Sequence, residues 1–138
     1  DPRNPNIKEI INKKIKRREN FRPFAPSILK DQVKNWFEED CDVPFMSEVK
    51  MIKKEKRKFI PGITHIDGSG RLQTITQNQN LNYYNLIQEF YKITSVPIIL
   101  NTSFNENEPI VNNPAEAIDC YIRTNMDILV IGNWVVQR

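Results

Sequence analysis

The chain has 138 residues, of which 39% are hydrophobic and 27% are charged. That length fits one domain that buries about two-thirds of its unfolded surface, and the composition excludes a disordered chain. No apolar run has the length of a membrane-spanning helix, and no signal peptide opens the chain. Cys41 and Cys120 lack metal-ligand spacing and His65 is the only histidine. We therefore expect free thiols, a cytoplasmic setting and no histidine-rich metal site.

The net charge of +3 is unevenly distributed, because the basic residues gather in two blocks. The first block covers residues 8–22 and the second covers residues 50–58. Neither block interleaves its basic residues with aromatic ones. This favours a solvated face, or a site for a phosphorylated small molecule, over nucleic-acid binding.

The chain begins at Asp1 without a methionine, so we expect residues 1–138 to be one domain cut from a longer polypeptide. Asn4 and Pro5 have the pattern of a helix cap followed by a proline in the first helical position. A helix is predicted from there, and the residues expected on its apolar face are Ile7, Ile10, Ile11 and Ile15.

Three cations, Lys16, Arg18 and Arg22, lie between this helix and a proline-rich segment. Pro23 and Pro26 forbid a helix over residues 21–27 and predict an extended, rigid segment. Arginines held beside a rigid segment are pre-organised to clamp an anion. The stretch is therefore a candidate anion site.

The centre of the chain predicts a short helix, a strand and a hairpin. The helix is expected at residues 31–38 and the strand at residues 43–52, with the basic residues 53–58 in an exposed loop. Residues 60–75 contain Asp-Gly-Ser-Gly, a tight turn, between two alternating segments. This pattern predicts a β-hairpin.

Four polar side chains surround the predicted hairpin turn. His65 and Asp67 share one face of the first strand, and Arg71 and Gln73 share a face of the second. His65 taken alone is better read as a structural histidine, but so many polar groups exceed what a turn requires, and this favours a functional cluster.

Helices and strands alternate through the second half. We predict them at residues 81–94, 96–100, 114 onward, 127–131 and 134–136. The residues expected to face the core are Tyr83, Leu86, Ile87, Phe90 and Ile93 in the first helix and Ala117, Ile118 and Tyr121 in the second. The whole pattern predicts an α/β fold with a mixed sheet.

A polar run, Leu100 to Asn105, closes the strand predicted at residues 96–100. Small amide and hydroxyl side chains at the mouth of a buried strand suit a phosphate, a nucleotide or a small acid. An ordinary polar turn is the alternative. If the strand continues, Asn101 and Ser103 share a face and Thr102 points away.

Three blocks together resemble the C-terminal domain of the O-carbamoyltransferases. The blocks are residues 18–27 (RENFRPFAPS), residues 64–74 (THIDGSGRLQT) and residues 100–111 (LNTSFNENEPIV), and residues 127–133 match the family's ending. The family includes nodulation carbamoyltransferases and enzymes that carbamoylate antibiotics such as tobramycin and cephamycin. The resemblance covers essentially the whole chain, and it implies a YrdC-like twisted open mixed sheet with flanking helices.

The resemblance also implies a reaction between carbamoyl phosphate and ATP. In the family, carbamoyl phosphate is cleaved to carbamate, which attacks the α-phosphate of ATP and gives carbamoyl adenylate and pyrophosphate. The carbamoyl group then passes to the hydroxyl of a small-molecule acceptor in an N-terminal half, which binds a metal ion and is absent here. The implied partners are therefore ATP with Mg²⁺, carbamoyl phosphate, the acceptor and that N-terminal half, and no membrane.

The family motifs imply roles for particular residues. The expected catalytic residues are Arg22, Arg71, His65 and Asp67, the arginines as phosphate or carbamoyl clamps and the other two orienting the carbamoyl group or a water. The residues expected to bind nucleotide or carbamoyl phosphate are Lys16, Arg18, Asn101, Ser103 and Asn105. No metal ligand is expected in this chain. Arg22, Arg71 and Ser103 are expected to line one concavity.

One departure from the family pattern affects the third block. Asn107 stands where many members have glycine, in a loop one residue shorter, which leaves the backbone shape of the loop open. Without its N-terminal half the fragment is expected to be inactive. Two other readings stay open: a non-catalytic nucleotide- or RNA-binding YrdC-like module, and a structural domain that supports a catalytic half.

Overall fold

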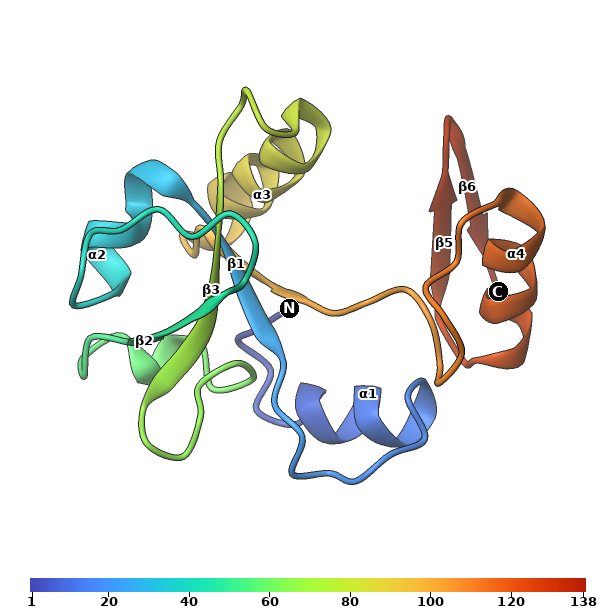
Figure 1. Ribbon diagram of the computed structural model, residues 1–138, viewed down its shortest axis with the longest axis horizontal. Coiled ribbons are helices and arrows are strands. Elements are labelled where there is room, and N and C mark those ends of the chain that lie inside the picture. The colour runs from blue at the N-terminus through green and yellow to red at the C-terminus, as the bar shows by residue number, and fades with distance from the viewer. The chain divides into compact units, whose positions relative to one another are not determined.

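The computed structural model describes residues 1–138 (Figure 1). The chain divides into two compact units, and each is described by itself. The first contains residues 1–7 and 23–102, and the second contains residues 8–22 and 103–138. The first unit holds an open, mixed, four-stranded sheet and the second a two-stranded antiparallel sheet. The predicted α/β class with an open mixed sheet is confirmed.

The sheet of the first unit has the strand order β2-β3-β1-β4. Its strands are β1 (Ala25–Leu29), β2 (Glu48–Met51), β3 (Ser69–Ile75) and β4 (Ile98–Asn101). β1 and β3 are parallel neighbours, with Leu29 opposite Ile75, and the other pairs are antiparallel. The extended segment predicted after Pro23 is thus the start of a central strand.

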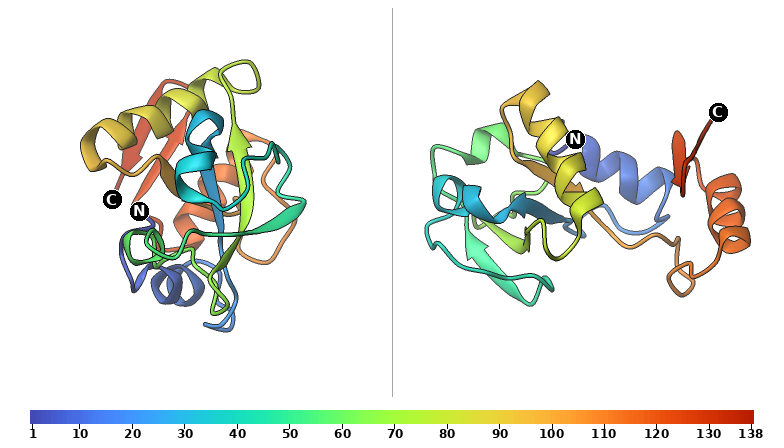
Figure 2. Two further views of the ribbon diagram at one scale, coloured as in Figure 1. Left: turned by 90° about the vertical axis from the view of Figure 1, so that its left-hand side faces the viewer. Right: turned by 90° about the horizontal axis from the view of Figure 1, so that it is seen from above.

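Helices cover the two faces of this sheet. The short helices η1 (Lys30–Gln32) and α2 (Val33–Trp36) follow β1, and α3 (Leu81–Thr94) follows β3. Figure 2 shows α2 and α3 on opposite sides of β1 and β3. On one side Val33 and Trp36 pack with Ile28 of β1, and on the other Ile87 packs with Leu29. The chain therefore leaves two adjacent parallel strands toward opposite faces.

The predicted hairpin over residues 60–75 is wrong, because only its second half is a strand. β3 pairs with β2 and β1, and residues 60–66 form turns and coil. The backbone N–H of Gly62 donates to the Pro2 carbonyl (2.9 Å), and a side chain at Gly62 would collide with Ile7. Backbone committed to the N-terminal segment cannot also form a ladder with β3.

The strand predicted at residues 43–52 forms only in its second half, as β2. Met46 has a φ of 53°, in the left-handed region, and Pro44 has no backbone donor, so both interrupt an extended ladder. Val43 instead exchanges two hydrogen bonds with Thr74: its N–H donates to Oγ1 (2.9 Å), and its carbonyl accepts from the Thr74 N–H (2.9 Å).

The helix predicted at residues 81–94 has the predicted bounds, and Tyr83, Ile87 and Phe90 pack against the core as predicted, but Leu86 and Ile93 do not. Ile87 is fully buried, whereas Leu86 is 58% and Ile93 84% exposed. The residues that join Ile87 against Leu29 and Ile75 are Tyr83, Tyr84 and Tyr91. By hydrophobicity alone, leucine and isoleucine rank above tyrosine. A tyrosine ring, however, can bury a larger apolar area against the sheet.

The second unit contains α4 (Pro114–Arg123), β5 (Ile128–Ile131) and β6 (Trp134–Gln137). The start of α4 and the bounds of both strands agree with the prediction to within one residue. α1 (Ile7–Lys14) begins in the first unit and continues in the second, two residues later than Pro5 predicted. In α4, Ala117, Cys120 and Tyr121 are buried, but Ile118 is exposed, contrary to prediction. In β5 only Leu129 is buried. Both cysteines are free thiols, as predicted, and no helix is long and apolar enough to cross a membrane.

The α3 packing face gives a matched test. Ile87→Ala should lower the free energy of unfolding by about 2–5 kcal/mol, because it leaves a cavity between the helix and the sheet. Leu86→Ala should change it by less than about 0.5 kcal/mol, because its side chain is exposed. Urea unfolding followed by circular dichroism measures both. Equal losses would contradict the observed face.

Candidate anion and nucleotide site

The predicted site residues belong to both units. Arg71, His65, Asp67 and Asn101 lie in the first unit, and Lys16, Arg18, Arg22, Ser103 and Asn105 lie in the second. β4 ends at Asn101. Ser103 therefore lies beyond the strand, and the predicted common face of Asn101 and Ser103 does not exist. The single concavity expected for Arg22, Arg71 and Ser103 stays a prediction.

In the first unit a row of polar side chains crosses the sheet. The Oε1 atom of Gln73 accepts hydrogen bonds from Ser27 Oγ (2.7 Å) and Asn101 Nδ2 (2.8 Å), while its Nε2 donates to the Pro44 carbonyl (3.2 Å). These residues come from three adjacent strands, β1, β3 and β4. Gln73 therefore holds Asn101 in one orientation at the end of its strand.

Arg71 lies two residues before Gln73 and so on the same face of β3. Its side chain is exposed and makes no hydrogen bond or ion pair within the chain. The guanidinium is therefore available to an anion, next to a row of amide groups whose orientation is fixed. This arrangement can bind a phosphate or carboxylate at its charged end and an amide or carbonyl along the row.

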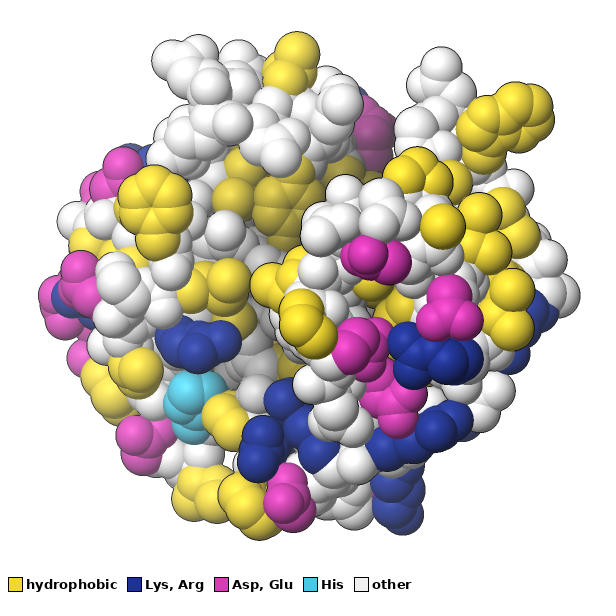
Figure 3. Space-filling view, turned by 45° about the vertical axis from the view of Figure 1, so that its right-hand side comes forward, with side chains coloured by type: hydrophobic (Ala, Val, Ile, Leu, Met, Phe, Trp, Pro, Cys, Tyr) yellow, Lys and Arg dark blue, Asp and Glu magenta, His cyan; other side chains and the backbone are white.

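His65 and Asp67 lie in the tight turn that leads into β3. The Asp67 carboxylate accepts hydrogen bonds from the N–H (2.9 Å) and hydroxyl (2.6 Å) of Ser69, and His65 Nδ1 lies 3.1 Å from the same hydroxyl. The bonds from Ser69 lower the pKa of Asp67. The imidazole, the only histidine side chain of the chain, is visible on the surface in Figure 3. Both residues thus shape the turn, and a role toward a carbamoyl group stays a prediction.

In the second unit a buried lysine organises the polar loop. Lys16 is 2% exposed. Its Nζ donates to the carbonyl (2.7 Å) and hydroxyl (3.1 Å) of Ser103 and to the carbonyl (2.7 Å) and side-chain Oδ1 (2.8 Å) of Asn105. Burial lowers the pKa of Lys16, and the nearby Arg18 lowers it further. An ammonium has three protons, so these four acceptors engage all of them.

A second buried side chain, Asn12, fixes the turn that carries the arginines. Asn12 is fully buried in α1. Its Nδ2 donates to the carbonyls of Asn20 (3.3 Å) and Arg22 (3.0 Å), and its Oδ1 accepts from Arg18 Nε (2.8 Å). The Arg22 guanidinium, half exposed, pairs with Glu19 at 3.0 Å. Asn12 thus holds the guanidinium of Arg18 and the backbone carbonyl of Arg22.

Carboxylates and arginines hold the far side of the loop. The Glu108 carboxylate accepts from the backbone N–H groups of Glu106 (3.3 Å) and Asn107 (3.0 Å) and from Arg123 NH2 (2.9 Å). The backbone donors, its own among them, and Arg123 lower the pKa of Glu108 to about 2. The Glu106 carboxylate, 11% exposed, lies between Arg17 (3.3 Å) and Arg123 (3.2 Å). In Figure 3 acidic and basic side chains lie side by side on the surface.

Comparison with known proteins identifies the chain. The sequence profile of the carbamoyltransferase C-terminus family matches residues 1–138. The chain belongs to this family. Nodulation protein NolNO of Sinorhizobium fredii (strain NBRC 101917 / NGR234) is 42% identical over 100% of this chain and 21% of its own length. Uncharacterized protein MJ1051 of Methanocaldococcus jannaschii is 39% identical over 95% of this chain and 26% of its own length.

Nodulation protein U of Bradyrhizobium diazoefficiens is 38% identical over 75% of this chain and 18% of its own length. The carbamoyltransferase C-terminal domain thus spans about a quarter of the length, or less, of these curated relatives. The family prediction made from the three blocks is confirmed.

Sequence reasoning missed several residues that position the site of this carbamoyltransferase domain. Asn12 lies among the isoleucines of α1, and a polar residue at a buried helical position was the signal available for it. Gln73 was noticed, but only as part of a hairpin that does not form. Arg123 and Glu108 gave no signal, because their 2.9 Å ion pair joins residues 15 positions apart that local patterns do not connect.

Most basic side chains of the second block, residues 50–58, contact other groups of the first unit. Lys50 bonds Glu39 (2.7 Å) and Glu48 (2.9 Å), and these carboxylates raise its pKa. Lys56 lies over the Trp36 ring at 5.1 Å. The block begins in β2 with Lys50 and continues through turns into the short helix η2 (Arg57–Phe59). Its charges are therefore largely used within the first unit.

The Lys16 contacts predict a local loss of stability. Lys16→Met should destabilise the second unit by roughly 2–3 kcal/mol, because the acceptors of Ser103 and Asn105 lose their charged donor. Hydrogen exchange should accelerate in residues 103–111. Lys14→Met is the control, since Lys14 is exposed and makes no contact. Equal exchange in both variants would contradict the anchoring role.

The ionisation of Glu108 predicts a pH dependence. Its folded pKa of about 2 lies below the unfolded value near 4.5, so the carboxylate stabilises the fold above pH 4.5. That contribution is lost as pH falls from about 4.5 to 2. Stability should therefore fall less steeply over this range in Glu108→Gln than in the wild type or in Glu38→Gln, which removes an exposed carboxylate without side-chain contacts. Parallel acid-unfolding curves for all three proteins would contradict the assignment.

Proposed function

We propose that this domain binds ATP and carbamoyl phosphate and forms carbamoyl adenylate. In this scheme carbamoyl phosphate and water give carbamate and phosphate. A carbamate oxygen then attacks the α-phosphorus of ATP, and pyrophosphate leaves. An acceptor hydroxyl finally takes the carbamoyl group and releases AMP, in the remaining, N-terminal part of a longer protein. Membership of the carbamoyltransferase C-terminus family supports this assignment.

The observation that carries the proposal is that Lys16 connects the cationic stretch with the polar run that ends at Asn105. Lys16 opens the cationic stretch, and it holds Ser103 and Asn105, which lie 87 and 89 positions away. Two segments so far apart in the chain are brought together by a buried ammonium, with Arg18 beside it. Their convergence supports a common role for the cations and the polar loop in binding phosphate.

Each group suits a step of the proposed reaction. The attack on the α-phosphorus concentrates negative charge on the phosphate oxygens, which a guanidinium stabilises through paired hydrogen bonds. Arg71, exposed and without a partner in the chain, is the group we assign to this role. Asn101, oriented by Gln73, is assigned to the carbamoyl amide. Lys16 is assigned to shaping the loop, because its protons are engaged there. ATP enters as its Mg²⁺ complex.

The test uses the full-length protein and measures pyrophosphate release with ATP and carbamoyl phosphate. Arg71→Ala should lower the rate about 10²–10³-fold, because transition-state charge is left uncompensated. Ser103→Ala should also lower the rate, because it removes a hydroxyl that bonds both Lys16 and Asn105. Lys54→Ala, which removes an exposed cation without contacts, should leave the rate unchanged.

Circular dichroism must first show that each variant is folded. Undiminished pyrophosphate release in Arg71→Ala would contradict the role of this arginine. Salt-sensitive binding of RNA by the wild type, without binding of ATP, would overturn the enzyme assignment in favour of a nucleic-acid-binding module.

A further inference from the structure

A cavity lies at the edge of the first unit where β1 and β3 end. These strands are parallel neighbours, so both carboxyl ends meet at this edge. After β1 the chain turns into η1 and α2 on one face, and after β3 it passes to α3 on the other (Figure 2). Chain segments that diverge from adjacent parallel strands leave a crevice between them, and such crevices are where open α/β sheets bind ligands.

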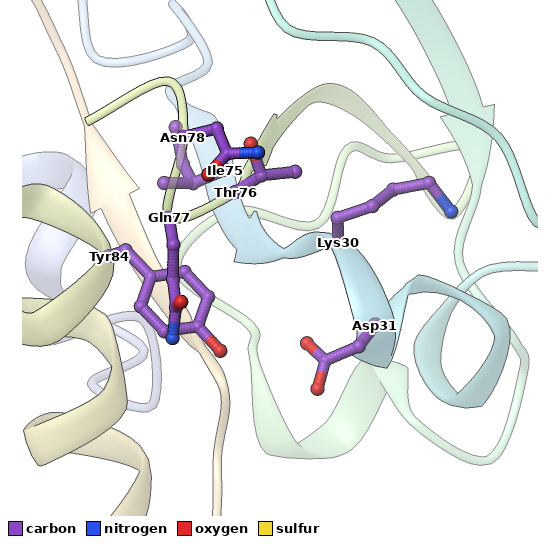
Figure 4. Close-up of a pocket in the computed structure, with 7 residues that line it drawn as sticks. All are labelled: Lys30, Asp31, Ile75, Thr76, Gln77, Asn78 and Tyr84. Carbon is purple, nitrogen blue, oxygen red and sulfur yellow. The ribbon is translucent and has the colours of Figure 1, made fainter. Parts of the chain in front are cut away.

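The cavity has a volume of about 390 Å³ and is lined mainly by polar residues, although apolar atoms form the larger part of its surface (Figure 4). Asp31 follows β1, Gln77 and Asn78 follow β3, and Tyr84 comes from the first turns of α3. Figure 4 shows the Asp31 carboxylate and the Tyr84 hydroxyl pointing toward each other, with the Gln77 amide beside the tyrosine ring. The buried side chain of Ile75 forms part of the wall.

These polar groups are largely unused by the fold. The amides of Gln77 and Asn78 and the hydroxyl of Tyr84 make no hydrogen bond within the chain. The Asp31 carboxylate has one long contact, 3.5 Å from Gln32 Nε2. Two amides, a carboxylate and a phenol thus present several donors and acceptors around one aromatic face.

The charge of the cavity excludes recognition of an anion. Its one cation, Lys30, extends away from Asp31 in Figure 4, and its ammonium pairs with Asp40 at 2.8 Å. The unpaired charge that remains is the carboxylate of Asp31. A phosphate or carboxylate would therefore meet repulsion here, whereas a hydroxyl would find a charged acceptor.

We propose that this cavity binds a neutral sugar ring. The ring hydroxyls would donate to Asp31 and exchange hydrogen bonds with the two amides, and its apolar face would pack on Tyr84. The ring could come from a free monosaccharide or from the ribose of a nucleoside, since both present the same chemistry. The site uses none of the residues assigned to phosphate or carbamoyl binding, and the proposal does not depend on that assignment.

The experiment titrates the ¹⁵N-labelled 138-residue chain with glucose, adenosine and glucose 6-phosphate. Glucose or adenosine should shift the side-chain amide signals of Gln77 and Asn78, with saturation in the millimolar range typical of a few hydrogen bonds. Glucose 6-phosphate should bind more weakly than glucose, because of Asp31. Response to adenosine but not glucose would identify ribose as the ring, and response to glucose would identify a monosaccharide.

Variants localise the binding. Asp31→Ala should weaken binding of the responding ligand about tenfold, as expected for one hydrogen bond to a charged group, and Tyr84→Ala should weaken it further. Glu55→Gln, which removes an exposed carboxylate of the same unit, should not change it. The proposal is overturned if neither glucose nor adenosine shifts these signals at about 50 mM. It is also overturned if glucose 6-phosphate binds more tightly than glucose, or if Glu55→Gln weakens binding as much as Asp31→Ala.

Discussion

The second unit depends on the burial of one ammonium. Lys16 is almost fully excluded from water, and a buried charge is tolerated only when its hydrogen bonds are satisfied. The carbonyl and side-chain oxygens of Ser103 and Asn105 satisfy it, and the loop takes the conformation that brings these four oxygens to one point. Methionine would fill the same space but would leave the oxygens without a donor. The lysine therefore determines the conformation of the loop, and this conformation exists before any ligand binds.

A second constraint acts on the opposite side of the same loop. Arg123 bonds Glu106, Glu108 and Asp119 at distances from 2.7 to 3.2 Å, and Glu108 accepts two backbone N–H groups. Isolated exposed ion pairs contribute little, but here Glu108 also accepts backbone N–H groups, and Glu106 is shared by Arg17 and Arg123. The loop is thereby fixed to α4 as well as to the end of α1. Side chains from the end of α1, the loop and α4 thus together fix the backbone of the loop.

Local patterns in the sequence predicted most elements and failed where distant segments compete for the same backbone. The bounds of α3 followed from its run of apolar residues, and the start of α4 followed from the Asn113-Pro114 pair, in which Asn113 caps the helix. The hairpin prediction was wrong because Gly62 bonds Pro2, a contact that cannot be inferred from the residues near Gly62. The candidate site was predicted as a set of residue types, and its role in binding stays a prediction. Its supports were missed for different reasons: Asn12 is a polar residue at a buried position of α1, and the Arg123 ion pairs with Glu106 and Glu108 join residues that local patterns do not connect.

The polar run that ends β4 is held at both ends by different chemistry. Asn101 is oriented by Gln73 within the sheet, through a neutral amide bond of 2.8 Å, and Ser103 and Asn105 are oriented by a charged lysine. A ligand that binds such a run does not have to pay the conformational entropy of ordering it. Under the proposed function the same argument applies to Arg71, because its exposed guanidinium has no partner in the chain. A guanidinium already bonded to a carboxylate would have to break that pair to bind phosphate, so its strength as an anion ligand depends on its being unpaired.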